Sequence, residues 1–389
     1  MSRLATVIRP DIQPGRRVVA VSDIHGNLPF LQGILREVKL SRDDVLVLVG
    51  DILEKGRDSL ATLRYVMDLQ KKYTVYSLCG NCDYIDRVFL EGGTPDDAFS
   101  VQMNRRYGAP VEHDSADKLL WPVLNHWRER STLIQMALEL GYPMPQRESD
   151  LPALRAALLD YFPKETAFLM NLPHILEAGN FIFVHGGVPR EDRLDELSAY
   201  SCMKNDDFLG QGRRFQKWVV VGHWPVTLYN PHIQRSAPIL DRERRIASID
   251  GGCVLKLDGQ LNALLIPDIN GDEMDFAAYD GLEQATALDA QEESADSLNI
   301  RWSDSVVEPL ADLGDSVLVR HPSSGRELWV PRSFLSTWRD GKLHTEDATD
   351  YRLPVCPGDR LSLVCQTQRG CLVKKNYITG WYYGRIQRG

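Results

Sequence analysis

Six side chains that can bind a metal ion each follow closely on a short apolar run of the sequence. Two of them lie in SDIHGN, and one lies in each of GDILEKG, GNCD, VHGG and VGHWP. They are Asp23, His25, Asp51, Asn81, His185 and His223. Carboxylate oxygens together with neutral imidazoles suit manganese, iron or zinc, whereas a purely oxygen site would suit magnesium or calcium. The set therefore predicts a site for divalent transition metals.

A site for two metal ions needs one ligand that touches both, and a carboxylate does this because its charge offsets the repulsion between the cations. Asp51, directly after an apolar run and a glycine, is predicted to be that bridge. Asp23 and His25 are two residues apart, so in an extended chain they point to the same side and can share one ion. Asn81, His185 and His223 are predicted to complete the second ion's ligands.

The apolar runs that precede these residues predict the strands that position them. They are VVAV (18–21), VLVLV (45–49), TVYSL (74–78), FIFV (181–184), WVVVG (218–222) and RIASI (245–249). Runs without polar alternation indicate strands covered on both faces, and the amphipathic segments 28–39 and 59–73 predict helices between the early strands. This pattern is typical of a layered α/β fold, in which the carboxyl ends of strands meet at one rim and bind ligands.

The rest of the chain divides into three parts. Residues of about 84–175 form an insert with helical periodicity, strongest in 118–141 and 151–171. This insert is either a packing subdomain or a lid that selects substrate. Residues 281–304 are acidic and small and predict a linker or surface helix, which separates a domain at 1–280 from short strands at 305–389.

The motifs SDIHGN, GDILEKG, GNCD, VHGG and VGHWP resemble, in order and spacing, those of the calcineurin-like metallophosphoesterases, and within them the phosphoprotein phosphatase branch. The segment ASIDGGCVLKLDGQLNALLI also resembles the stretch that closes that fold. The resemblance spans roughly residues 15–268, apart from the insert. It implies a four-layer α/β/β/α sandwich and the same six metal ligands. It also implies hydrolysis by a metal-activated water, without a covalent phosphoenzyme.

Three positions depart from the motifs of that family. Cys82 stands where the family has the histidine that serves as general acid, beside Asn81 and Asp83. A thiol is a weak hydrogen-bond donor, so this change predicts a preference for substrates whose leaving group needs no proton. Glu54 and Lys55 replace an aspartate and an arginine, and Lys55 keeps the positive charge for phosphate without the two-pronged geometry of arginine.

The second phosphate-binding arginine of the family lies between its last two histidine motifs. There SCMKNDDFL resembles the matching segment and offers Lys204, with Arg213 and Arg214 as alternatives. For each of these basic residues a solvated position on the surface is an equally ordinary role.

The C-terminal segment PGDRLSLVCQTQRGCLVKKNYITGWYYGRI resembles a small Src-homology-3-like β-barrel. Its Trp381, Tyr382 and Tyr383 either line a groove that binds a peptide or belong to the core and rim of the barrel. Self-association through this part of the chain is a further expectation.

Composition narrows the partners and the compartment. The formal net charge of −9, without a long basic run, disfavours nucleic acid as a partner. No apolar stretch is long enough to span a bilayer, the start of the chain lacks a signal-peptide pattern, and seven scattered cysteines fit the reducing cytoplasm. Cys79 and Cys82 form a CxxC pattern, which admits redox or zinc chemistry as an alternative.

The leading functional hypothesis is a hydrolase of phosphate monoesters, similar to a serine/threonine protein phosphatase, acting on a phosphorylated protein or small molecule. A second hypothesis is a dinucleoside polyphosphate hydrolase, because GHWP resembles the GHTP of that group. A third is a metal-binding pseudophosphatase that serves as an interaction module.

Overall fold

The computed structural model describes residues 3–93, 95, 97–110 and 115–389. The chain divides into two compact units. The first comprises Met1–Trp224, Pro238–Val254 and Leu261–Tyr279, and the second comprises Pro225–Ala237, Leu255–Gln260 and Asp280–Gly389. The second unit begins for the last time at residue 280, close to the end of the predicted domain at 1–280. Two short earlier segments, 225–237 and 255–260, also belong to it.

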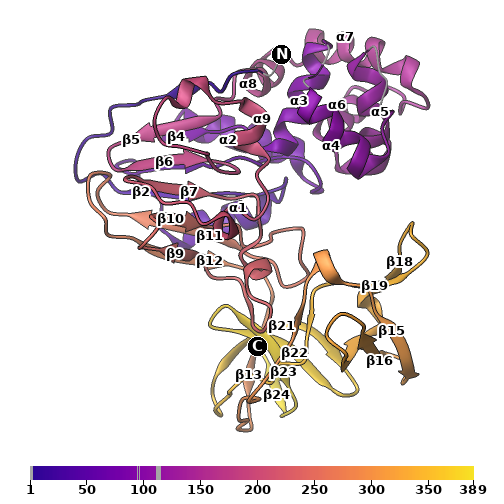
Figure 1. The fold of residues 1–389 in the computed structure, drawn as a ribbon. Helices are drawn as coiled ribbons and strands as arrows, with labels where there is room; N and C mark the ends of the chain where they lie inside the picture. Colours follow the sequence, from indigo (N-terminus) through magenta and orange to yellow (C-terminus); the bar gives the residue numbers. More distant parts are fainter. Residues whose placement is uncertain (1–2, 94, 96, 111–114) are drawn as a thin grey trace. The chain divides into compact units, whose positions relative to one another are not determined.

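The first unit is built on two β-sheets (Figure 1). The five-stranded sheet has the order β12-β11-β2-β3-β4, and β2, β3 and β4 run parallel. Its strands are β2 (Val18–Val21), β3 (Val45–Leu48), β4 (Thr74–Ser77), β11 (Leu261–Ile266) and β12 (Asp275–Tyr279). The first three confirm the strands predicted from the apolar runs in that part of the sequence.

The six-stranded sheet has the order β1-β5-β6-β7-β10-β9, in which β6, β7 and β10 are parallel neighbours. Its strands are β1 (Val7–Ile8), β5 (Ile175–Ala178), β6 (Phe181–Val184), β7 (Trp218–Val221), β9 (Ile239–Asp241) and β10 (Ile246–Ser248). Residues of both sheets form one apolar cluster, with Val18 and Val47 from one and Phe183 and Val220 from the other. The sheets therefore pack face to face.

Helices cover the other face of the five-stranded sheet. Val19 and Leu46 point there and share a core with α1 (Leu28–Glu37) and α2 (Ser59–Gln70). The predicted segments 28–39 and 59–73 thus form helices, each starting at the predicted residue and ending two or three residues early. The strands are buried on both faces, which explains their unbroken apolar sequences.

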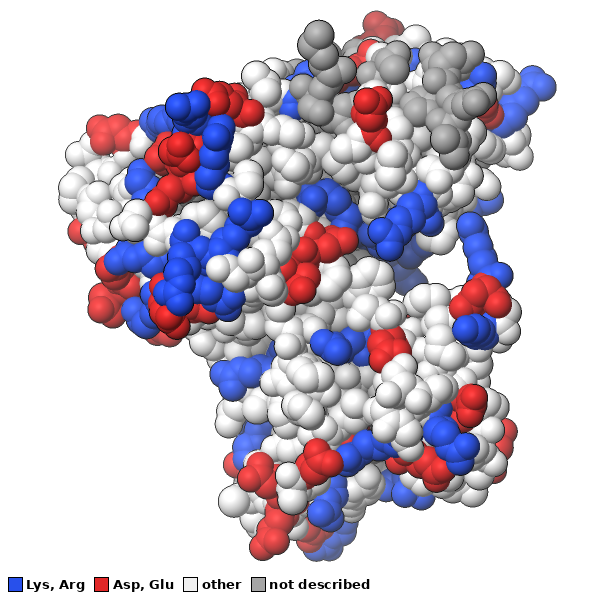
Figure 2. Space-filling model, viewed as in Figure 1, with Lys and Arg blue, Asp and Glu red and all other residues white. Residues whose placement is uncertain are grey.

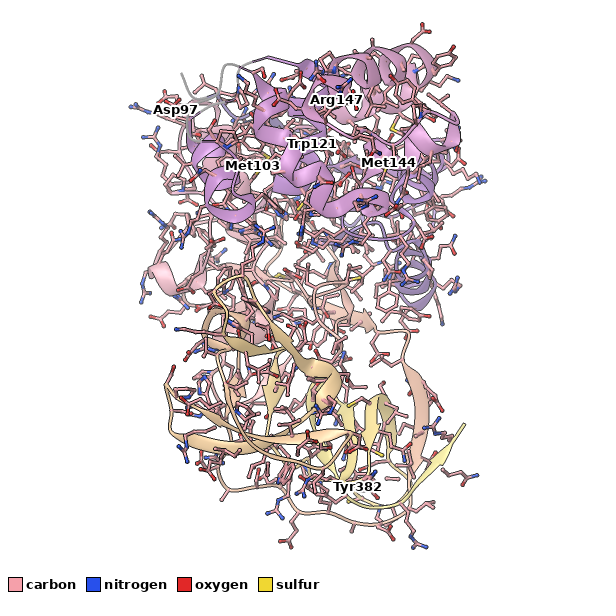
Figure 3. All side chains as sticks on the ribbon, turned by 90° about the vertical axis from the view of Figure 1, so that its right-hand side faces the viewer. Asp97, Met103, Trp121, Met144, Arg147 and Tyr382 are labelled. Carbon is pink, nitrogen blue, oxygen red and sulfur yellow. The ribbon has the colours of Figure 1, made fainter. Side chains whose placement is uncertain are left out.

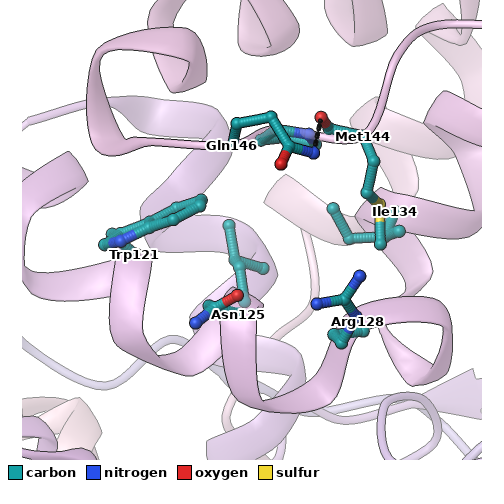
Figure 4. Close-up of a pocket in the computed structure, with 8 residues that line it drawn as sticks. Trp121, Asn125, Arg128, Ile134, Met144 and Gln146 are labelled. Atoms are coloured by element: carbon teal, nitrogen blue, oxygen red, sulfur yellow. Dashed lines mark hydrogen bonds between the residues drawn. The ribbon is translucent and has the colours of Figure 1, made fainter.

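The insert is helical, as its periodicity predicts. Its helices are α3 (Asn81–Glu91), α4 (Asp97–Tyr107), α5 (Ala116–Trp127), α6 (Thr132–Glu139), α7 (Leu151–Tyr161) and α8 (Pro163–Met170). A pocket of about 50 Å³ lies among them, lined by Trp121, Ile134 and Met144 (Figure 4). Gln146 closes part of it by donating a hydrogen bond from Nε2 to the Met144 carbonyl at 2.9 Å. A pocket of this volume has room for water but not for a nucleotide.

The second unit consists of β-strands. Its largest sheet has the order β24-β13-β21-β22-β23-β8, beside the three-stranded sheet β15-β16-β17 and the pairs β14-β20 and β18-β19. The strands are β8 (Gln234–Arg235), β13 (Glu283–Ala287), β14 (Asn299–Ile300), β15 (Glu308–Asp312), β16 (Ser316–His321), β17 (Arg326–Pro331), β18 (Leu335–Thr337), β19 (Leu343–Thr345), β20 (Ala348–Thr349), β21 (Arg360–Thr367), β22 (Gly370–Lys375), β23 (Ile378–Tyr382) and β24 (Ile386–Arg388). Within the described residues none of these sheets closes on itself, so the predicted barrel is not confirmed.

Two expectations for the C-terminal part differ from the structure. Residues 281–304, predicted as a linker or surface helix, contain β13 and β14. In β13 the small side chains of Ala285 and Ala287 are buried and alternate with more exposed ones, a weak strand signal that the acidic composition masks. Trp381 and Tyr382 are buried in the core and only Tyr383 is exposed, so the three do not line a groove together.

Charged side chains of both signs intermingle on the face drawn in Figure 2. Among the residues that the structure describes, no helix is both long and apolar enough to cross a membrane.

Candidate metal centre

The carboxyl ends of parallel strands from both sheets carry the six predicted ligands. Asp23 and His25 follow β2, Asp51 follows β3, and Asn81 begins α3 shortly after β4. From the other sheet, His185 follows β6 and His223 follows β7. Asp23, His25, Asp51 and His185 belong to two overlapping groups, and Asn81 and His223 each lie against His185.

Asp51 is the residue that joins the cluster. One oxygen of its carboxylate lies with atoms of Asp23 and His185, all within 4.8 Å of one another, and another such group is formed by Asp51, His25 and Cys82. The His185 Nε2 atom is 3.4 Å from Asp51 Oδ1, and His25 Nε2 is 3.7 Å from Asp51 Oδ2. Asp51 thus presents one oxygen to each of two neighbouring groups, as a bridging carboxylate would.

The buried histidines His25 and His185 each turn one ring nitrogen toward Asp51. His185 Nδ1 lies 2.9 Å from the Val49 carbonyl oxygen and donates its hydrogen to it, while His185 Nε2 faces Asp51 Oδ1 and Asn81 Oδ1 and would bind a metal ion in place of its proton. His25 Nε2 is buried and, within the described part of the chain, has no hydrogen-bond partner. A buried nitrogen without a partner costs free energy unless a ligand satisfies it. The donor set and this nitrogen fit divalent metal ions.

The remaining two predicted ligands have protein partners in this structure. Asn81 Oδ1 is 3.2 Å from His185 Nε2. The ring of His223 lies 5.2 Å from that of His185, and its Nε2 is 2.7 Å from Asp206 Oδ1 and 3.1 Å from Lys204 Nζ. The backbone N–H of His223 donates to Asp23 Oδ2 at 2.9 Å. Asp206 is a neighbour of the site that the sequence prediction did not include.

The backbone at the site adopts unusual conformations. Asp23, His25, Asp51 and His223 all have φ between 47° and 67°, in the left-handed region that costs a non-glycine residue about 1–3 kcal/mol. Such strain persists only where the surrounding structure enforces it, and it gathers at functional sites. A second constraint on the backbone of the site is lack of space at Gly80. A Cβ atom there would overlap the backbone and the carboxylate of Asp51, so only glycine fits.

Several buried carboxyl groups gather at the site, and their electrostatics reflect this crowding. Burial raises the pKa of Asp23 to about 6, and burial together with Asp51 raises the pKa of Asp83 to about 7. Burial lowers the pKa of His185, but Asp51 and Asp23 outweigh this and raise it to about 9. Asp250, which follows β10, has a pKa raised well above its ordinary value by burial and by Asp23. Bound cations would offset this crowding of carboxylates.

Asp83 and Cys82 are adjacent in the sequence but face different neighbours. The Asp83 carboxylate accepts hydrogen bonds from the backbone N–H groups of Gly80 at 2.9 Å and Leu53 at 3.0 Å, so it joins two loops of the site. Cys82 is 1% exposed, and burial and the Asp51 carboxylate raise the pKa of its thiol well above the ordinary value. Cys79 is a free buried thiol as well, so the CxxC pattern forms no disulfide here.

Both predicted phosphate-binding lysines lie at the site. Lys55 is half-buried and interacts electrostatically with Asp51 and Cys82, while Lys204 forms an ion pair with Asp206 beside His223. The alternatives Arg213 and Arg214 bond to Pro189 and to Glu243 instead. Of these three residues, Lys204 is the one with a contact to a predicted metal ligand among the described residues, at 3.1 Å from His223 Nε2.

Glu54 contacts the helical insert through its carboxylate. Its carboxylate accepts a hydrogen bond from the backbone N–H of Thr132 at 2.6 Å, at the start of α6. Burial raises the pKa of Glu54 to about 7, and burial together with Glu54 raises the pKa of Asp86 in α3 well above the ordinary value. Two carboxyl groups thus meet in the core where the insert joins the first unit.

This pair predicts that the metal-free protein loses stability as pH rises. Unfolded carboxyl groups release their protons near pH 4, whereas Glu54 holds its proton to about pH 7. The folded state therefore binds more protons between these values, and the free energy of unfolding falls across them. Replacing Asp86 by Asn should reduce the fall in Tm between pH 5 and pH 8 by at least about 2 °C. The exposed Glu37→Gln variant is the control, and equal falls in Asp86→Asn and the wild type would contradict the prediction.

Comparisons with known proteins agree with the geometry of the site. A family model described as calcineurin-like phosphoesterase matches residues 16–249. This match covers more than half of the chain, which therefore belongs to the calcineurin-like phosphoesterase family. Members of this family hold a dinuclear divalent metal centre, and the two ligand groups that share Asp51 are the candidates for it here.

Among curated proteins, the chain is similar to symmetrical bis(5'-nucleosyl)-tetraphosphatases. It is 31% identical over 130 residues to the enzyme of Legionella pneumophila (strain Lens), which covers 32% of this chain and 42% of that protein. It is 29% identical over 171 residues to the enzyme of Coxiella burnetii (strain Dugway 5J108-111), covering 42% and 56%. The chain thus spans about half the length of these relatives.

Among solved structures, the chain is similar to a protein serine/threonine phosphatase from Saccharomyces cerevisiae with similarity to human phosphatase PP5. The TM-score is 0.39 at 11% identity, with 72% of this chain and 84% of that chain covered.

Proposed function

We propose that this chain is a metal-dependent hydrolase that transfers a phosphoryl group from an ester or anhydride to water. The observation that carries the proposal is the position of Asp51, whose carboxylate belongs to two neighbouring groups of ligands. Following the sequence motifs, Asp23, His25 and Asp51 would hold one ion, and Asp51, Asn81, His185 and His223 the other. His25 Nε2 lies 3.9 Å from Asp23 Oδ1, and Asp23 also lies within reach of His185. Their mixed oxygen and imidazole donors suit manganese, iron or zinc. When bound, such ions polarise the phosphoryl group and lower the pKa of a bound water.

The chain's own basic residues would hold the substrate. Lys55 lies beside Asp51, and Lys204 lies beside His223, so each adjoins a predicted ligand. Both are point charges that tolerate several orientations of a phosphate, unlike the planar fork of arginine. Binding of the phosphoryl group is therefore expected to be less strictly oriented than in relatives that use arginine.

The leaving group receives little help from the protein. Cys82 occupies the position of the general acid, and burial keeps its thiol protonated and of low acidity. A weak acid with weak hydrogen bonds assists a departing alkoxide poorly. The proposed substrates are therefore those that leave without a proton, namely aryl phosphates and phosphoanhydrides, ahead of serine and threonine phosphates.

A dinucleoside polyphosphate is the second candidate substrate. Its phosphoanhydride bond breaks without protonation of the leaving group, which suits the buried Cys82 thiol. The curated relatives named above are symmetrical bis(5'-nucleosyl)-tetraphosphatases, and this similarity supports such a compound as a candidate beside the phosphate monoester.

A substrate panel tests the proposal. We expect the full-length, metal-loaded protein to hydrolyse p-nitrophenyl phosphate and diadenosine tetraphosphate faster than phosphoserine peptides, measured as kcat/KM. Turnover of the phosphopeptides at the higher rate would contradict the assignment of substrate class. A chain that binds metal but turns over none of the three would instead be a binding protein.

A further inference from the structure

The helical insert contains a basic side chain that no motif predicts and whose charge acts on residues of the metal centre. Arg106 lies near the end of α4, seven residues after Phe99 and three after Met103. Because seven residues make almost two full turns of a helix, these three side chains share one face. Phe99 and Met103 are buried, so Arg106 lies at the end of the buried face of α4, where its own side chain is exposed. Figure 3 labels Met103 within this helix.

Aromatic contacts fix this face of α4 against the elements that build the site. The Phe99 ring lies 5.5 Å from the ring of Tyr84 in α3 and 5.5 Å from that of Tyr200 in α9 (Ala199–Met203). The helix α3 starts with Asn81 and Cys82, and α9 ends just before Lys204. The α4 helix is therefore anchored to the two helices whose ends carry side chains of the metal centre.

The end of α4 is held in place as well. The Tyr107 ring meets the ring of Trp127 in α5 edge to face, with their centroids 6.0 Å apart. The guanidinium carbon of Arg106 lies 5.8 Å from the centre of the Tyr107 ring. These contacts limit where the Arg106 side chain can point.

The charge of Arg106 acts on the site. Surrounding protein atoms lower the pKa of Arg106, but Tyr107, Asp51 and Asp206 outweigh this and raise it. The charge of Arg106 also acts on Lys204. Burial is the main cause that lowers the pKa of Lys204, Asp206 raises it, and Arg106 contributes a smaller lowering. Arg106 is nevertheless exposed to solvent, and in the described part of the chain it forms no ion pair. Arg106 is thus an exposed cation whose charge acts on Asp51 and Asp206.

We propose that Arg106 is a substrate-binding residue through which the insert selects oligophosphates, by holding a second phosphoryl group beside the one at the metal centre. The proposal rests on the proposed hydrolytic function. The metal ligands and Lys55 already serve one phosphoryl group, and Lys204 is paired with Asp206. A third cation on a separate element is more than a single phosphoryl group needs. Its planar guanidinium donates two parallel hydrogen bonds to a phosphate, which gives the added contact both strength and orientation.

Binding of two small probes tests this role without relying on turnover. Isothermal titration of the full-length, metal-loaded protein would compare inorganic phosphate with methylenediphosphonate, a diphosphate analogue that is not hydrolysed. We expect Arg106→Ala to raise the Kd of methylenediphosphonate about 10-fold to 100-fold and that of phosphate by no more than about twofold. Arg106→Lys should recover part of the loss, because it keeps the charge and loses the two-pronged geometry.

Arg105→Ala is the matched control, since Arg105 precedes Arg106 in α4 and lies about 100° around the helix. It should leave both dissociation constants unchanged. Equal weakening of both probes by Arg106→Ala, or weakening of neither, would overturn the proposal. Failure of the proposed hydrolytic function would appear differently, as absent turnover by the wild-type protein whatever its affinity for the two probes.

Discussion

Replacing Asp51 by Asn is expected to lower kcat/KM by at least about 100-fold on every substrate that the wild-type protein hydrolyses. The reason lies in the two oxygens of Asp51, which face His185 at 3.4 Å and His25 at 3.7 Å. Asparagine has the same size, but it replaces one carboxylate oxygen by an amide nitrogen that cannot bind a cation. It also removes the negative charge that holds two cations together. Both metal positions should weaken at once.

Steady-state rates on p-nitrophenyl phosphate and diadenosine tetraphosphate measure this effect. Asp43→Asn is the matched control, because Asp43 is exposed in the loop before β3 and lies outside the ligand groups. A loss shared by the control would indicate damage to the fold. An Asp51→Asn variant with wild-type rates would show that the bridging role assigned to Asp51 is wrong.

Replacing Cys82 by His is expected to change which leaving groups the protein accepts. Histidine would place a stronger proton donor where the structure has a buried thiol that is 1% exposed. A positioned general acid is typically worth about 100-fold to 10,000-fold for a leaving group that needs a proton. The rate on a phosphoserine peptide should therefore rise by at least about 100-fold relative to that on p-nitrophenyl phosphate.

The ratio of the two rates is the quantity to measure, because it cancels changes in metal content or in the fraction of folded protein. Cys82→Ser keeps the small side chain without adding a comparable acid, so its ratio should stay near that of the wild type. If Cys82→His left the ratio unchanged, the leaving group would not depend on this position and the assigned substrate preference would fail.

Much of the first unit can be predicted from sequence because its strands are buried on both faces. Runs such as VVAV and FIFV have no polar alternation, and each became a strand whose carboxyl end carries a ligand. Two-sheet packing then brings Asp23 and His185 together although 162 positions separate them. The sequence predicted this approach because each polar motif follows an apolar run, and the carboxyl ends of such strands meet at one rim.

The residues that the sequence prediction missed reach the site from other directions. Arg106 comes from a helix of the insert that packs through Phe99 on Tyr84 and Tyr200, and its link to the site is the interaction of its charge with Asp51 and Asp206. Asp206 is found only through its contact with His223. The period of an amphipathic helix indicates a buried face but not which neighbour covers it. Asp250 alone had a usable signal, because it directly follows the RIASI strand.

The second unit was predicted less well, again for physical reasons. Its strand β13 uses alanines at the buried positions, and alanine is a weak strand former. Trp381 and Tyr382 belong to the segment GWYY. The sequence of this segment does not distinguish aromatic rings buried in a core from aromatic rings that line a groove. Their hydrogen bonds decide the matter, since Trp381 Nε1 donates to the buried Thr349 carbonyl at 2.8 Å.

Elemental analysis of the purified protein tests the central claim most directly. After loading with manganese, iron or zinc and removal of free ions, we expect two metal ions per chain in the wild type and fewer than one in Asp51→Asn. The Asp43→Asn control should keep two. A wild-type chain that binds no metal under these conditions, or an Asp51→Asn variant that keeps both ions, would contradict a dinuclear centre bridged by Asp51.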